Sequence, residues 1–127
     1  MQILLILLLL FSALVADNDE YHHTEHMQKE FSHIALTQVQ KQQIKKVLQQ
    51  FRYDLQEYRN LKNKIQKQKQ RVFMKKTLNT KELEKINQKL YKKAIEVENN
   101  FLRQLHDILN KQQREQFLLY FDDWEVE

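Results

Sequence analysis

The sequence has 127 residues, enough for one domain, and it contains no glycine, no proline and no cysteine. These absences exclude tight hairpin turns, glycine-rich phosphate loops, disulfides, thiolate catalysis and zinc ribbons. The formal net charge of +4 suggests acidic partners such as nucleic acid, lipid headgroups or acidic unfolded polypeptides. The remaining composition favours helices, so we expect an all-α protein.

The chain opens with an apolar run from residue 3 to residue 15, followed by Ala16 and a polar stretch. This run is too short for a membrane-spanning helix of ~20 residues, but its length suits the apolar region of a secretory signal. Segment 1–16 is therefore predicted to be a signal peptide. The alternative is an uncleaved amphipathic or core helix. Residues 17–127 are expected to form a single helical domain.

The polar, histidine-rich segment 17–32 is predicted to form a short first helix. Thr37 is the expected N-cap of a long second helix, and Gln40 at the third helical position completes a capping box. Apolar residues then recur at three- and four-residue steps, which is typical of an amphipathic helix. They are Ile44, Leu48, Phe51, Leu55, Tyr58, Ile65 and Val72.

The clearest interior break is segment 77–80, where Asn79 is placed to cap the next helix. That helix carries one apolar stripe at Leu83, Ile86, Leu90, Ala94, Val97, Phe101 and Ile108, and an adjoining face at Tyr91, Ile95, Leu102 and Leu105. Asn110 is expected to cap a last helix that carries Phe117, Tyr120, Phe121 and Trp124 on one side.

The pattern predicts a long central helical hairpin with short flanking N- and C-terminal helices. A single hairpin this thin cannot cover its own apolar faces, so we expect an antiparallel two-fold dimer. A monomeric up-down four-helix bundle is the alternative.

Two helix starts share one pattern: Leu36 and Thr37 precede Gln40, and Leu109 and Asn110 precede Gln113. Any helical protein can use such a capping solution. The pair nevertheless resembles the two LTxxQ motifs of the Spy/CpxP family of bacterial periplasmic proteins, and the resemblance covers essentially the whole mature chain. Asn110 stands where the family usually has threonine, and asparagine caps a helix equally well.

The resemblance implies a cradle-shaped antiparallel dimer in the periplasm that holds unfolded or partly folded proteins on a concave face without ATP. Some members of the family instead inhibit an envelope-stress sensor kinase, and others bind zinc or related metals. A kinase adaptor and a heavy-metal sensor are therefore the alternative functions. The expected partners are unfolded client proteins and a second copy of the chain, with a sensor kinase's periplasmic domain for the adaptor. Nucleic acid and stable membrane insertion after signal cleavage are not expected.

A client-holding surface needs apolar patches together with positive charge. The basic end of the first long helix carries both, at Leu61, Lys62, Lys64, Ile65, Lys69, Arg71, Val72, Phe73 and Met74. Electrostatic attraction to acidic clients would speed their encounter and weaken with salt. The alternative is that these lysines form a solvated face beside a stripe of core residues.

His22, His26, Glu30 and His33 fall on one face if the first helix extends that far. Imidazole and carboxylate groups at this spacing can bind zinc, nickel, cobalt or copper, although exposed histidines often bind metal adventitiously. The expected function requires no cofactor. There is no cysteine, Ser12 and Ser32 lie in the signal and beside the first motif, and no catalytic pocket is indicated, so we do not expect an enzyme.

Overall fold

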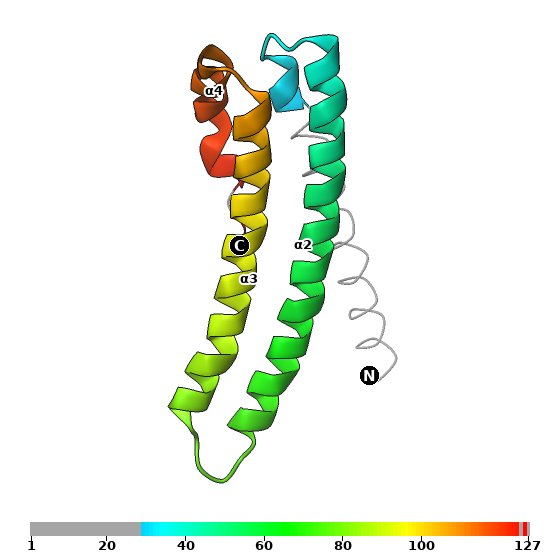
Figure 1. The fold of residues 1–127 in the computed structure, drawn as a ribbon. Coiled ribbons are helices and arrows are strands. Elements are labelled where there is room, and N and C mark those ends of the chain that lie inside the picture. Colours follow the sequence, from blue (N-terminus) through cyan, green and yellow to red (C-terminus); the bar gives the residue numbers. More distant parts are fainter. Residues whose placement is uncertain (1–28, 125, 127) are drawn as a thin grey trace, which may run out of the picture. The chain divides into compact units, whose positions relative to one another are not determined.

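The structure, a computed structural model, describes residues 29–124 and Val126 (Figure 1). The predicted signal peptide and most of the predicted first helix lie outside these residues, and so do the side chains of residues 122–124. Contacts divide the chain into two units, residues 1–35 and residues 36–127. The described part of the first unit is residues 29–35, of which residues 29–32 are helical. The single domain over residues 17–127 stays a prediction.

The second unit is built on two long helices, α2 (Gln38–Phe73, 36 residues) and α3 (Thr80–Ile108, 29 residues). They lie side by side and antiparallel, joined by a short turn (Figure 1). At the other end of this hairpin follow α4 (Lys111–Phe117) and the 3-10 helix η1 (Leu118–Trp124). The part of the chain that the structure describes contains helices and no strand, which confirms the all-α class.

The hairpin core follows a heptad pattern along α2. Five of the six buried residues of α2 recur every seven positions, namely Ile44, Phe51, Tyr58, Ile65 and Val72, and the sixth is Val47. A seven-residue repeat keeps one seam of a helix facing its neighbour, as in coiled coils. The buried residues of α3 are Ile86, Val97, Phe101 and Leu105. The rings of Phe51 and Phe101 lie 4.3 Å apart between centroids, so aromatic packing joins the two helices directly.

The turn between the long helices needs no glycine, because every described residue has a negative φ. The backbone N–H of Met74 donates to the Gln70 carbonyl oxygen at 3.1 Å and closes α2. Asn79 caps α3 as predicted, since its side-chain oxygen accepts from the Glu82 N–H at 3.1 Å. The Lys75 ammonium and the Glu82 carboxylate, 3.1 Å apart, bridge the turn.

The last predicted helix differs from the expectation, because its α-helical part ends at Phe117 and continues as the 3-10 helix. Phe117 is buried, and its ring meets that of Phe121 edge-on at 6.4 Å. The side chain of Trp124 lies outside the described residues.

Only part of the apolar surface of α3 is buried in the core. Leu105, expected on the adjoining face, is buried in the core, whereas Tyr91 and Ile95 are 66% and 58% exposed. Tyr58 of α2 is buried, and burial raises the pKa of its hydroxyl above the ordinary 10.0, with a smaller contribution from Tyr91. The Tyr58 hydroxyl is therefore neutral in the folded protein at neutral pH.

Candidate functional site

Both predicted capping boxes are present in the structure. At the start of α2 the Thr37 N–H donates to Gln40 Oε1 at 2.9 Å, and the Gln40 N–H donates to Thr37 Oγ1 at 3.1 Å. At the start of α4 the Asn110 N–H donates to Gln113 Oε1, and the Gln113 N–H donates to Asn110 Oδ1, both at 2.9 Å. Each box satisfies backbone donors that a helix start leaves without a partner.

The two capping boxes meet. Gln40 Nε2 donates to Gln113 Oε1, and Gln113 Nε2 donates to Gln40 Oε1, both at 2.9 Å. Gln40 Nε2 also donates to the Ile108 carbonyl oxygen at 3.0 Å, at the end of α3. We call this reciprocal pair the glutamine clasp. It joins the start of α2 to the start of α4 across 73 positions of sequence.

The clasp gives the paired motifs a structural role. Gln113 is buried with 6% of its surface exposed, and Leu109 beside it is buried at 4%. Leu36 of the first motif is half-buried. A buried amide must find hydrogen-bond partners, and each of these amides supplies them to the other. The clasp was not foreseen from the sequence, although a hairpin necessarily brings the starts of α2 and α4 to one end.

Positive charge gathers at the opposite end of the hairpin. Residues 62–93 contain twelve lysines and arginines and only two glutamates, a net charge of +10, whereas the whole chain carries +4. We call this segment the basic tip. It comprises the last turns of α2, the turn and the first half of α3, which lie together in space (Figure 1). The tip is therefore a concentrated source of positive potential.

The structure divides the predicted client-binding residues into two groups. Ile65 and Val72 are buried with Ile86 in the hairpin core, so they hold α2 against α3 and do not reach the surface. Leu61 and Lys69 are half-buried. The others lie on the surface, namely Lys62, Lys64, Arg71, Phe73 and Met74.

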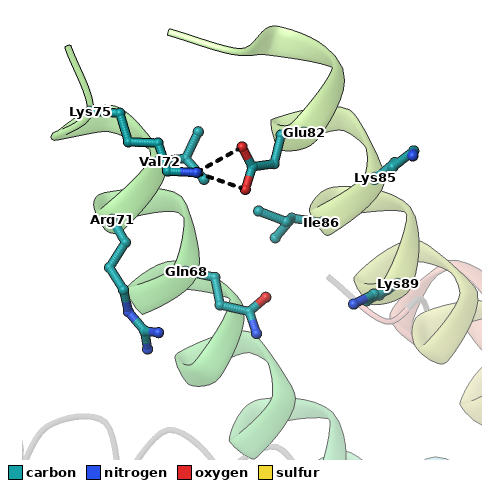
Figure 2. Close-up of a pocket in the computed structure, with 8 residues that line it drawn as sticks. All are labelled: Gln68, Arg71, Val72, Lys75, Glu82, Lys85, Ile86 and Lys89. Carbon is teal, nitrogen blue, oxygen red and sulfur yellow. Dashed lines mark hydrogen bonds and ion pairs between the residues drawn. The ribbon is translucent and has the colours of Figure 1, made fainter. Parts of the chain in front are cut away.

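A cleft of about 490 Å³ lies between the two helices in the basic tip (Figure 2). Its basic lining residues are Arg71, Lys75, Lys85 and Lys89, and Glu82 is its one acidic lining residue. The core residues Val72 and Ile86 also line the cleft, although both are almost fully buried, and Gln68 completes the lining. Lys85 and Lys89 were missed in the sequence because the basic surface was attributed to α2 alone.

The predicted metal ligands lie mostly beyond what the structure describes. His22 and His26 are outside the described residues, Glu30 is buried, and His33 is exposed. Among residues 29–124, no group of three or more histidine, aspartate or glutamate side chains is arranged to hold a metal ion. The metal site stays a prediction that depends on the histidines outside this range.

Comparison with protein-family models, with curated proteins and with solved structures finds no match to this chain. Within residues 29–124, no helix combines the length and the apolar character needed to cross a membrane.

Proposed function

We propose that this protein is an ATP-independent periplasmic chaperone of the Spy/CpxP type, a binding protein rather than an enzyme. The observation that carries the proposal is the exposed surface at the end of α2. Phe73 and Met74 are 72% and 80% exposed at the end of α2, a helix segment that also exposes the cations Lys62, Lys64 and Arg71. Apolar side chains mixed with positive charge match the two features that unfolded acidic polypeptides present.

This surface suits transient holding rather than tight capture. Only a few large apolar side chains are exposed on it, so the apolar area available to a client is small. The lysines lie in water, where their attraction to a client is long-ranged and screened by salt. Such a surface binds unfolded chains quickly and releases them without nucleotide.

The aggregation of reduced α-lactalbumin, an acidic client, tests this function. The purified protein should suppress light scattering without nucleotide, and suppression should weaken as salt rises. Replacing Lys62, Lys64 and Arg71 together with glutamine should reduce its potency by about threefold or more, because the long-range attraction falls. The matched control replaces three exposed lysines at the other end of α2, Lys41, Lys45 and Lys46, with glutamine. Unchanged aggregation at several-fold molar excess of the protein would contradict the proposal.

We also propose that two copies form an antiparallel dimer, whose two basic surfaces would make one cradle. The support is the second apolar face of α3, where exposed Tyr91 and Ile95 lie one turn apart and Leu102 is half-buried. Sedimentation equilibrium should show a dimer at micromolar concentration. Replacing Tyr91 and Ile95 with serine should give a monomer, whereas Tyr53→Ser, at an exposed position of α2, should leave the dimer intact. A monomeric parent protein would refute the dimer. It would not decide the chaperone activity, which the aggregation assay tests separately.

A further inference from the structure

The apex of the hairpin, residues 73–79, exposes three apolar side chains within six residues of sequence. Phe73 is 72% exposed, Met74 is 80% exposed, and Leu78 in the turn is 48% exposed. Single exposed apolar residues are common on soluble proteins, but a group of three within six residues at one protruding end is unusual. The turn forms the far end of the hairpin from α4 (Figure 1). Phe73 ends α2, and Met74 and Leu78 belong to the turn, so all three lie at this end of the hairpin.

The charge around the apex is almost entirely positive. The basic tip carries a net +10, whereas outside residues 62–93 the acidic residues outnumber lysines and arginines, fifteen to nine. The field of the tip thus orients the hairpin end toward a negative surface before contact is made. It also disfavours pairing with the same end of a second copy, since the two tips repel.

The cleft behind the apex offers cations from both helices. Lys75 is paired with Glu82 at 3.1 Å, whereas Arg71, Lys85 and Lys89 have no ion-pair partner among the described residues (Figure 2). Arginine and lysine side chains are the usual protein partners of phosphate groups. Val72 and Ile86 line the cleft as well, but they are buried in the hairpin core and offer a ligand little apolar area. The cleft therefore supplies cations for phosphate groups, and the exposed side chains of the apex supply the apolar contact.

We propose that the hairpin tip docks on a bilayer surface that contains anionic phospholipid. Phe73, Met74 and Leu78 enter the boundary between headgroups and acyl chains, and the cations of the basic tip bind the phosphates. This peripheral mode resembles that of interfacial helices, which combine buried apolar side chains with attraction to anionic lipid. It goes beyond the proposed chaperone function, because it gives the protein a place at the membrane whether or not it holds clients.

The chaperone proposal already gives acidic polypeptides the end of α2 with Phe73 and Met74. Leu78 in the turn and the cleft cations Lys85 and Lys89 lie outside that surface. A lipid interface engages both groups, because the apolar side chains enter it end-on while the cations meet its phosphates. Anionic lipid is therefore the occupant that accounts for the apex and the cleft together.

Vesicle co-sedimentation tests the proposal. The protein should bind vesicles of phosphatidylglycerol mixed with phosphatidylcholine, should bind pure phosphatidylcholine vesicles weakly, and should be released by salt. Replacing Phe73 and Met74 with serine should weaken binding on the order of tenfold, because their apolar area no longer enters the interface. Lys85→Gln combined with Lys89→Gln should also weaken it on the order of tenfold, through lost attraction to the anionic surface.

Matched control variants distinguish docking at the tip from nonspecific binding through exposed residues elsewhere. Leu118→Ser with Leu119→Ser removes two exposed apolar residues of η1, and Lys41→Gln with Lys45→Gln removes two exposed charges far along α2. Neither control should change vesicle binding. The proposal would be overturned if the protein bound the anionic and the pure phosphatidylcholine vesicles equally well. It would also be overturned if the control variants weakened vesicle binding as much as the variants of the tip. Polyglutamate that binds as tightly as the anionic vesicles, without needing Phe73 and Met74, would assign the tip to acidic polypeptides instead.

The vesicle assay and the aggregation assay can give different answers, because Lys85 and Lys89 of α3 are not among the residues varied in the α-lactalbumin experiment. A protein that binds anionic vesicles but leaves aggregation unchanged would sustain docking and refute the chaperone. The reverse result would sustain the chaperone and refute docking.

Discussion

Replacing Phe101 with alanine should lower the free energy of unfolding by about 3–5 kcal/mol, the largest effect we expect from a single substitution. Phe101 is 1% exposed, and its ring packs against Phe51 of the other long helix at 4.3 Å. The substitution removes a large apolar side chain from water-free surroundings and leaves a cavity that a helix pair can only partly close. The free energy of unfolding of a small domain is about 5–15 kcal/mol, so this substitution would remove much of it.

Denaturant unfolding followed by far-UV circular dichroism measures this effect. Protein concentration should be held constant, because dimerisation would add to the apparent stability. Tyr53→Ala is the matched control, since this aromatic residue of α2 is 61% exposed and its loss should change stability by less than about 0.5 kcal/mol. Equal losses in the two variants would show that the Phe51–Phe101 contact is not a centre of the core.

Disrupting the glutamine clasp should cost nearly as much. Gln113→Ala removes the capping side chain of α4 and both hydrogen bonds between the two amides, while Gln40 keeps its bonds to the Ile108 carbonyl oxygen and the Thr37 N–H. Loss of a cap costs about 0.5–2 kcal/mol and each lost hydrogen bond about 0.5–1.5 kcal/mol, so a loss of about 2–4 kcal/mol is expected. Gln40→Ala should cost a similar amount, because it removes the capping side chain of α2, the same two bonds to Gln113 and the bond to the Ile108 carbonyl oxygen.

A double-mutant cycle decides whether the two glutamines act as a pair. Gln40→Ala and Gln113→Ala together should cost less than the sum of the single losses, with a coupling of about 0.5–3 kcal/mol. The controls Gln42→Ala and Gln112→Ala remove exposed glutamines from the same two helix starts and should be nearly neutral. Additive losses from Gln40→Ala and Gln113→Ala would mean that each glutamine only caps its own helix.

Gln113→Glu separates clasping from capping. The introduced carboxylate can still accept the Asn110 N–H bond, but it cannot donate to Gln40 Oε1 at neutral pH. Burial raises the pKa of such a carboxyl, so the variant should be destabilised at neutral pH and should recover as the pH falls through that pKa. A variant as stable as the parent at neutral pH would show that capping alone matters.

The helix boundaries could be predicted because their causes are local. Thr37, Asn79 and Asn110 cap the helices where the sequence indicates, since a cap depends on a side chain and a backbone donor three residues away. The apolar repeat of α2 could also be predicted, because apolar residues at helical spacing mark the face of a helix that packs against a neighbour. By contrast, the change from α4 to the 3-10 helix after Phe117 has no sequence signal that we can identify.

The composition and the repeat of apolar residues, by themselves, determined an all-α chain with a long helical hairpin and a basic, partly apolar segment at the end of α2. Only the tertiary structure decided how those residues are used. It buried Ile65 and Val72 against α3, brought Lys85 and Lys89 to the cleft, and joined Gln40 to Gln113 across the hairpin base. The physical reason is that periodicity shows that a helix has an apolar face, whereas only the neighbouring helix determines which of its residues are covered.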